Sequence, residues 1–143
     1  MQRRLNDSVT VSGQIGPGDV AALAEAGFTT IVCGRPDGEM AGQPTADSVR
    51  QAAEDAGLRF AFIPVQPGFP PSTEEAEEFR QLSEDGPIFA YCGSGPRMVL
   101  LASLAAAQAG RPVMEIAREA AEAGIDITPA LPLLQSRADQ DRP

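Results

Sequence analysis

A cysteine stands between an apolar run and an alanine-rich segment in the stretch "PIFAYCGSGPRMVLLASLAAAQAG". Four loop residues separate Cys92 from Arg97, namely Gly93, Ser94, Gly95 and Pro96. If a helix begins near Arg97, its positive end and the N–H groups of the loop converge on the sulfur and favour the thiolate. The guanidinium of Arg97 suits two oxygens of a tetrahedral oxyanion. The stretch therefore predicts an ionised nucleophile at the mouth of an anion-binding loop.

A second group of reactive side chains lies in "CGRPDGE". Asp37 is the candidate general acid and Glu39 the reserve, since an acid is needed most for esters with poor leaving groups. Alternatively, Asp37 caps the turn that follows it. Arg35 would either bind a substrate anion or pair with Asp37. Cys33 is either a small buried hydrophobe or a redox partner that forms a reversible disulfide with Cys92.

The composition limits the chemistry open to these residues. The chain of 143 residues has no histidine, which excludes Ser-His-Asp and Cys-His catalysis and histidine-ligated zinc. We expect neither a metal nor a cofactor. With 20 acidic and 11 basic residues the net charge is -9, which argues against nucleic acid or an anionic membrane as a partner. No apolar run approaches the roughly 20 residues of a membrane helix. We therefore expect a cytoplasmic protein whose two cysteines are free thiols.

Short β-type runs alternate with helical patterns, as is typical of βαβ units. The expected strands are residues 8 to 13, 29 to 34, 59 to 65 and 87 to 91. The expected helices are residues 16 to 27, 45 to 56, 72 to 82, 98 to 110 and 112 to 123. Right-handed crossovers then give an α/β fold, a three-layer α/β/α sandwich with a mainly parallel four-stranded sheet. We expect a single domain over 1 to 143, with its core over about 8 to 136 and a frayed tail over 137 to 143.

Ligands of such sheets bind outside the carboxyl ends of the strands. Three loops reach that edge in the expected fold: "CGRPDGE", "PVQPGFPP" and "CGSGPR". The cysteine loop lacks obvious aromatic walls, which hints at a shallow and permissive site.

The segment "AYCGSGPR" resembles the active-site loop of cysteine-dependent protein tyrosine and dual-specificity phosphatases, and also that of rhodaneses. Together with "SGQ", "RPDGE" and "GQPT", it makes residues 8 to 136 similar to a small bacterial phosphatase-like domain that is also fused to metallo-β-lactamase-like hydrolases. The resemblance implies that Cys92 attacks phosphorus to form a phosphocysteine. Arg97 and the N–H groups of residues 93 to 95 would hold the phosphoryl oxygens.

The same resemblance implies a cysteine phosphatase-like fold in which the strand before "CGRPDGE" lies beside the cysteine strand. The substrate would be a phosphorylated protein or a small phosphate ester, and metallo-β-lactamase-like sulfur or hydrolase enzymes would be associated partners.

The sequence departs from the usual phosphatase pattern, and these departures keep two alternatives open. Four residues rather than five separate cysteine and arginine, and Pro96 has no N–H to donate. Met98 replaces the usual hydroxyl residue, Tyr91 replaces a histidine, and "PVQPGFPP" carries no carboxylate. The short loop matches a rhodanese-type sulfurtransferase that carries a persulfide on Cys92. The third reading is a catalytically degenerate domain that senses oxidants or binds phosphorylated partners.

Overall fold

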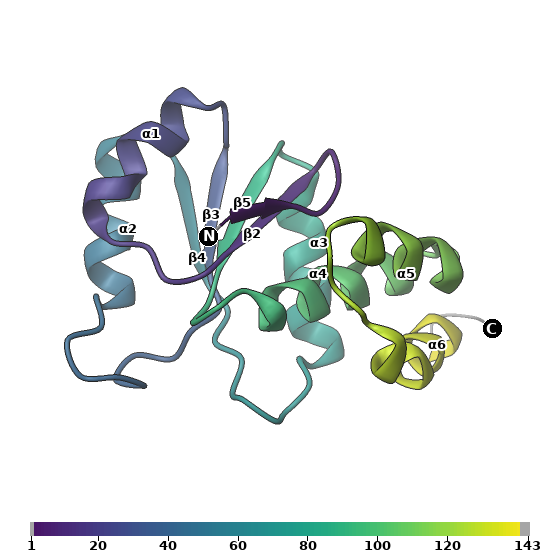
Figure 1. Cartoon of the computed structure of the whole chain (residues 1–143). Coiled ribbons are helices and arrows are strands. Elements are labelled where there is room, and N and C mark those ends of the chain that lie inside the picture. The colour runs from purple at the N-terminus through teal and green to yellow at the C-terminus, as the bar shows by residue number, and fades with distance from the viewer. Residues whose placement is uncertain (1, 141–143) are drawn as a thin grey trace.

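The computed structural model describes residues 2–140 and places a five-stranded sheet at the centre of the molecule (Figure 1). The strands are β1 (Gln2–Arg4), β2 (Val9–Ser12), β3 (Thr30–Cys33), β4 (Arg59–Phe62) and β5 (Ile88–Tyr91). Their order is β1-β2-β5-β3-β4, with β1 antiparallel to β2 and all other pairs parallel. The sheet is therefore mainly parallel, as predicted.

The central strand β5 brings three loops together at one edge of the sheet. Tyr91 pairs with Ser12 of β2 and with Cys33 of β3. Beyond the strands, the Cys92 N–H donates to the Ser12 carbonyl at 3.1 Å, and the Gly34 N–H donates to the Tyr91 carbonyl at 2.8 Å. The strand before "CGRPDGE" thus lies beside the cysteine strand, as the resemblance implies.

Helices cover both faces of the sheet, so the predicted three-layer α/β/α class is confirmed (Figure 1). One face carries the short 3-10 turn η1 (Pro17–Asp19), α1 (Val20–Glu25) and α2 (Ala46–Asp55). The other face carries α3 (Thr73–Ser83), α4 (Pro96–Gln108), α5 (Val113–Glu122), the turn η2 (Thr128–Ala130) and α6 (Leu131–Gln140).

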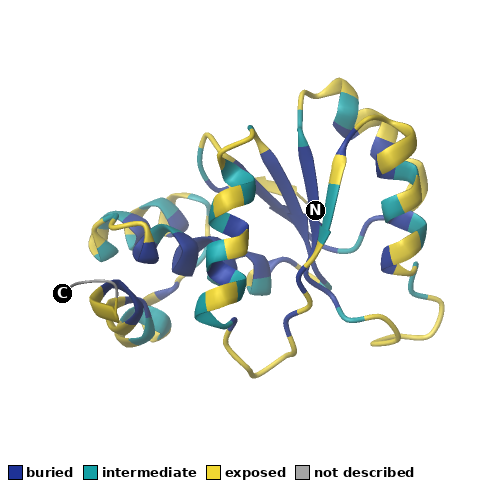
Figure 2. Ribbon diagram, turned by 180° about the vertical axis from the view of Figure 1, so that it is seen from behind, coloured by how far each residue is buried: buried dark blue, intermediate teal, exposed yellow. Residues whose placement is uncertain are grey.

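The alternation of side chains along β5 divides the core in two. Ile88 and Ala90 pack toward α3 to α6, whereas Phe89 and Tyr91 pack toward α1 and α2. Helix α4 buries nine of its 13 residues, so the apolar helix after the cysteine loop is buried on most sides, as expected (Figure 2). Both layers anchor the strand that ends at Cys92.

The start of α3 is fixed by a capping motif that the sequence predicts. The Ser72 side chain accepts from the Glu75 N–H at 3.0 Å, and the Glu75 carboxylate accepts from the Ser72 N–H at 2.8 Å. This reciprocal capping box fixes the first turn of α3. No helix within residues 2–140 is long and apolar enough to cross a membrane.

Two expectations about the chain ends need correction. The sheet has five strands rather than four, because the polar and exposed residues of β1 show no apolar alternation, yet they pair with β2. The tail was expected to fray from residue 137, but α6 continues to Gln140, and Leu134 and Arg137 are buried. Residues 141–143 of that expected tail lie outside the described part of the chain.

Arg137 explains why α6 stays docked. Its Nη2 donates to the Pro71 carbonyl at 2.6 Å and its Nη1 donates to the Gln108 side-chain oxygen at 3.2 Å. Arg137→Met is expected to lower the free energy of unfolding by about 2 kcal/mol, since both acceptors lose a buried, charged donor. Urea unfolding measures this change. Arg118→Met, at an exposed position on α5, is the control and should shift stability by less than about 0.5 kcal/mol. Equal effects of the two variants would contradict the assigned role.

Candidate active site

Cys92 follows the last residue of β5, and its loop leads directly into α4. The Gly95 N–H donates to the Cys92 sulfur at 3.1 Å. Gly95 has a φ of +112°, which L side chains rarely adopt, and it precedes the first residue of α4. Of the loop N–H groups that were expected to converge on the sulfur, that of Gly95 contacts it, and α4 begins at the next residue.

The exposure of Cys92 differs from the sequence-based expectation. The thiol was expected at the open mouth of the loop, but Cys92 is 0% exposed and belongs to the core beneath α3 to α6. The strand that carries it is buried on both faces, so the sulfur starts inside the molecule.

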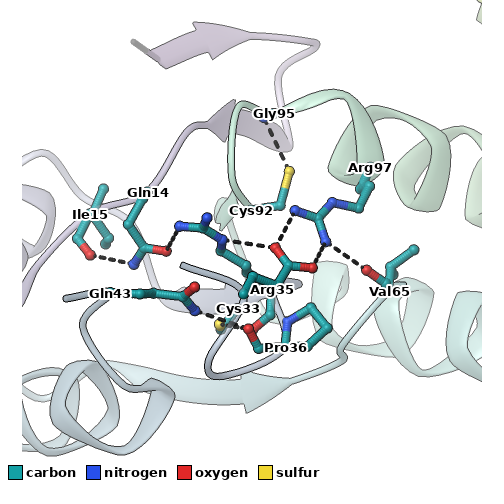
Figure 3. Close-up of polar contacts among 11 residues, drawn as sticks. Gln14, Ile15, Cys33, Arg35, Pro36, Gln43, Val65, Cys92, Gly95 and Arg97 are labelled. Carbon is teal, nitrogen blue, oxygen red and sulfur yellow. Dashed lines mark hydrogen bonds and ion pairs between the residues drawn. The ribbon is translucent and has the colours of Figure 1, made fainter. Parts of the chain in front are cut away.

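Arg35 and Arg97 lie close together beside Cys92 (Figure 3), and the Glu39 carboxylate bridges them. Its carboxylate accepts from Arg97 Nη1 at 2.7 Å and Nη2 at 2.9 Å, and from Arg35 Nε at 2.9 Å. Arg35 Nη1 also donates to the Gln14 side-chain oxygen at 3.0 Å. A Cβ on Gly93 would lie 3.0 Å from Arg97 Nη2 and 3.5 Å from Arg35 Nε. Both guanidinium groups therefore lie over the loop, and residue 93 has little room for a side chain.

Some N–H groups of Arg97 donate hydrogen bonds to protein oxygens, and others do not. One N–H of Nη1 and one N–H of Nη2 donate to the Glu39 carboxylate. The other Nη1–H donates to the Val65 carbonyl at 2.8 Å. The Nε–H and the second Nη2–H make no hydrogen bond to an oxygen within residues 2–140. These two N–H groups form a second fork of the kind that binds two oxygens of one anion. Arg97 is thus held in place by protein groups and also interacts with the Cys92 side chain, and this pair of donors has no oxygen acceptor.

The opposite charges of Glu39 and the two arginines stabilise one another. Hydrogen bonds from Arg97, and then from Arg35, lower the pKa of Glu39 below its ordinary value despite partial burial. Hydrogen bonds to Glu39 are the largest cause that raises the pKa of Arg97, and the neighbouring Cys92 side chain adds to the shift. Glu39 is therefore ionised at neutral pH and has no proton to donate, which argues against its reserve role as a general acid.

Asp37, the first candidate for the acid, lies apart from this group. Its carboxylate accepts from the Ala46 N–H at 2.8 Å, at the first residue of α2. Helix N-termini attract carboxylates because their N–H groups lack partners. Asp37 thus takes a capping role at α2, and among residues 2–140 it forms no hydrogen bond with Cys92, Arg35 or Arg97.

The two cysteines lie on opposite faces of the sheet. Cys33 packs with α1 and α2, and burial chiefly raises the pKa of its thiol. Cys92 packs with α3 to α6, and both thiols are free. Because a disulfide would require one side chain to cross the sheet, the redox-pair alternative is not supported, and Cys33 is the small buried hydrophobe.

Tyr91, at the usual histidine position, faces away from Cys92. Its hydroxyl is buried beside the Cys33 thiol and has no oxygen or nitrogen partner within residues 2–140. Burial, with Cys33 as the next cause, raises the pKa of this hydroxyl. Tyr91→Phe is expected to raise the free energy of unfolding by about 1 kcal/mol, because it removes an unpaired buried hydroxyl. Thermal unfolding measures it, and a clear loss of stability would show that the hydroxyl is bonded.

Sequence reasoning missed several contributors to the site. Gln14, in the quoted "SGQ" segment, anchors Arg35, and the Val65 carbonyl anchors Arg97. Met98 is a packing residue: its side chain fills the space that a Cβ on Gly34 would need. The "SGQ" motif could have pointed to Gln14. No residue type in the sequence identifies the Val65 backbone carbonyl as a hydrogen-bond acceptor. No cluster of three or more metal-ligating side chains occurs in the described chain.

The arrangement defines a class of protein. A central parallel strand that ends in cysteine, an N–H on the sulfur and an arginine at the start of the next helix are the features of a cysteine phosphatase-like α/β domain. Within this class, the chain belongs to the family of the phosphatase-like domain of the Beta-lactamase hydrolase-like protein, whose family model matches residues 2–110.

Individual relatives agree with this assignment. The Beta-lactamase hydrolase-like protein of Agrobacterium fabrum is 37% identical over 109 residues, which cover 76% of this chain and 25% of that protein. A candidate phosphatase from Neisseria meningitidis Z2491 has 33% identity and a TM-score of 0.77, over 94% of this chain and 96% of that one. The structure of PTPMT1 has a TM-score of 0.78 at 14% identity, over 98% and 95% of the two chains, and shows the fold alone. The chain spans about a quarter of the length of the Agrobacterium protein.

Proposed function

We propose that this chain is a cysteine-dependent hydrolase of phosphate monoesters, with Cys92 as nucleophile. The observation that carries the proposal is the Cys92 sulfur with the Gly95 N–H at 3.1 Å, beside the donor fork of Arg97. The Gly95 N–H and the Arg97 cation lie where they would stabilise negative charge on the sulfur during the reaction, and the fork complements two phosphoryl oxygens. The N–H groups of Gly93 and Ser94 would take further oxygens.

The proposed reaction has two displacements. The Cys92 thiolate attacks phosphorus, the P–O ester bond breaks, and the alcohol oxygen leaves with the bonding electrons and takes a proton from water. Water then attacks the phosphocysteine, the P–S bond breaks, and inorganic phosphate and the thiolate are regenerated. Arg97 stabilises charge on the transferred group in both steps. Glu39 acts on Arg97 as a positioning residue, and Arg35 in turn holds Glu39 rather than the substrate.

The broader context is also part of the proposal. The substrate class is a phosphorylated protein or a small phosphate ester. Two free cysteines suit a reducing cytoplasm. Relatives that carry the name Beta-lactamase hydrolase-like protein are about three times as long as this chain. Their name and length support an association with metallo-β-lactamase-like enzymes.

A sulfurtransferase of rhodanese type is the second candidate. The observation that favours it is the loop itself, in which four residues rather than five lie between Cys92 and Arg97. The same thiolate would then take sulfane sulfur from a donor such as thiosulfate, release sulfite, and pass the sulfur from a persulfide to cyanide.

Trapping the covalent intermediate on Cys92 separates the two candidates. The protein is mixed with an aryl phosphate or with thiosulfate, quenched in acid, and analysed by mass spectrometry of the peptide that contains residue 92. We expect a phosphoryl adduct from the ester, with Cys33→Ser as a control that still forms it. A persulfide from thiosulfate without a phosphoryl adduct would replace the proposal by the sulfurtransferase. Phosphate binding with no adduct from either donor would indicate the degenerate domain.

A further inference from the structure

Gln14 lies two residues after β2 and contacts both halves of the site (Figure 3). Its backbone N–H donates to the Gly93 carbonyl in the cysteine loop at 3.3 Å, and its side-chain oxygen accepts from Arg35 Nη1 at 3.0 Å. Its Nε2 donates to the Ile15 carbonyl at 2.7 Å, so the amide oxygen is the atom that faces Arg35. A Cβ on Gly13 would lie 3.1 Å from the Gly93 carbonyl oxygen, so the two segments pack closely. Gln14 thus joins the cysteine loop, through its main chain, to the arginines, through its side chain.

The guanidinium of Arg35 depends on this amide oxygen. Arg35 is 8% exposed, and within residues 2–140 its side-chain hydrogen bonds to oxygen are one to Gln14 and one, at 2.9 Å, to Glu39. A shielded donor that loses a protein partner gains little from water in exchange. Removing the Gln14 oxygen would therefore let the Arg35 guanidinium turn away from its present position, and the Glu39 carboxylate that it holds would move with it.

These contacts form one chain of hydrogen bonds across the edge of the sheet where the site lies. Its members, in order, are Gln14, Arg35, Glu39, Arg97 and the Val65 carbonyl. Gln14 follows β2, and Val65 lies in the loop after β4, so the chain begins and ends beside different strands. Each end residue is also held by a main-chain hydrogen bond of its own. The position of Arg97 over the cysteine loop is thus set from both ends.

We propose that Gln14 is a positioning residue for the phosphatase reaction: through Arg35 and Glu39 it aligns the guanidinium of Arg97 with the transferred phosphoryl group. This inference rests on the proposed function and adds a residue that acts on the reacting groups only through others. The Arg97 fork must meet two phosphoryl oxygens at once, so a small misplacement weakens the stabilisation of the transition state. Loss of the Gln14 acceptor should therefore lower the rate of hydrolysis although Cys92 and Arg97 are both still present.

Gln14→Met tests this role, because methionine keeps the length of the side chain and removes the acceptor. With p-nitrophenyl phosphate as substrate, kcat/KM should fall about tenfold. The Kd of tungstate, an inert tetrahedral oxyanion, should rise about fivefold in calorimetric titration, since the anion meets a misplaced fork. A variant that was only partly folded would instead lower the stoichiometry of the titration and leave Kd unchanged. In a Glu39→Gln background, Gln14→Met should cost less than about twofold more in kcat/KM, since its route to Arg97 is already broken.

Gln108, the last residue of α4, supplies a matched control. Its side-chain oxygen accepts from Arg137 Nη1 at 3.2 Å, and its Nε2 donates to the Thr73 carbonyl at 3.1 Å. It therefore makes the same two kinds of hydrogen bond as Gln14, but it belongs to the opposite end of the helix from the cysteine loop. Gln108→Met should lower the melting temperature and keep both kcat/KM and the Kd of tungstate within about twofold of the wild type.

The outcomes separate this inference from the function on which it rests. If the wild type hydrolyses the ester and binds tungstate, but Gln14→Met leaves both within about twofold of the wild type, the inference is overturned and the proposed function stands. A further loss of about tenfold in the Glu39→Gln background would show that Gln14 acts by another route, which also overturns the inference. If the wild type neither hydrolyses the ester nor binds tungstate, the proposed function fails, and the inference fails with it.

Discussion

Cys92→Ser should lose hydrolysis of an aryl phosphate by at least about 10⁴-fold. A serine hydroxyl is not ionised near neutral pH, and the chain has no histidine that could act as its base. The hydroxyl can still accept the hydrogen bond from Gly95, and the residue is about as large as cysteine, so the fold should remain intact. Steady-state release of the aryl alcohol measures the loss.

The second cysteine supplies the matched control for this experiment. Cys33 is also buried at the carboxyl end of a central strand, but it faces α1 and α2. Cys33→Ser should therefore keep its activity within about threefold of the wild type, provided that thermal unfolding shows both variants to be folded. Retained turnover in Cys92→Ser, or an equal loss in both variants, would refute Cys92 as the nucleophile.

Glu39→Gln should lower kcat/KM by about 100-fold and lower the free energy of unfolding by about 2 kcal/mol. An amide offers one acceptor and a donor where the carboxylate offers two acceptors, so it cannot hold the end-on fork of Arg97. Arg35 and Arg97 then face each other without the anion between them, and both side chains are largely shielded, at 10% and 19% exposure. Kinetics and urea unfolding provide the two measurements.

Inorganic phosphate should partly restore the thermal stability of Glu39→Gln. This recovery would distinguish the loss of an anion from simple misfolding. Phosphate can occupy the space between the two guanidinium groups, so it should raise the melting temperature of the variant more than that of the wild type. Glu84→Gln is the control, since its ion pair with Arg80 is 64% exposed on the Glu84 side, and it should change neither property appreciably. Unchanged or higher kcat/KM in Glu39→Gln would show that Glu39 competes with the substrate instead of positioning Arg97.

Acid conditions provide another test of the Glu39 bridge. Because the pKa of Glu39 in the folded protein lies below its ordinary value of 4.5, its ion pairs contribute full stability above that pH. This contribution is lost as the pH falls through the lower, folded pKa. The stability difference between wild type and Glu39→Gln should therefore shrink on acidification below about pH 4.5. A difference that stays constant to lower pH would contradict the assigned ionisation.

The alternation of strands and helices was sufficient to predict the α/β/α layers and four of the strands, because burial imposes periodic apolar positions. The spacing of Cys92 and Arg97 likewise located the candidate nucleophile and its arginine. The loop over residues 35 to 44 has no such periodicity, and its conformation decides whether Asp37 or Glu39 reaches the arginines.

The sheet that separates Cys33 from Cys92 also determines how the enzyme would recover from peroxide. A sulfenic acid formed on Cys92 has no second thiol on its own side of the sheet, and the chain contains only two cysteines. Rescue by an intramolecular disulfide is therefore closed to it. Recovery would depend on a soluble reductant such as glutathione, which makes the lifetime of the oxidised enzyme a property of the surrounding thiol pool.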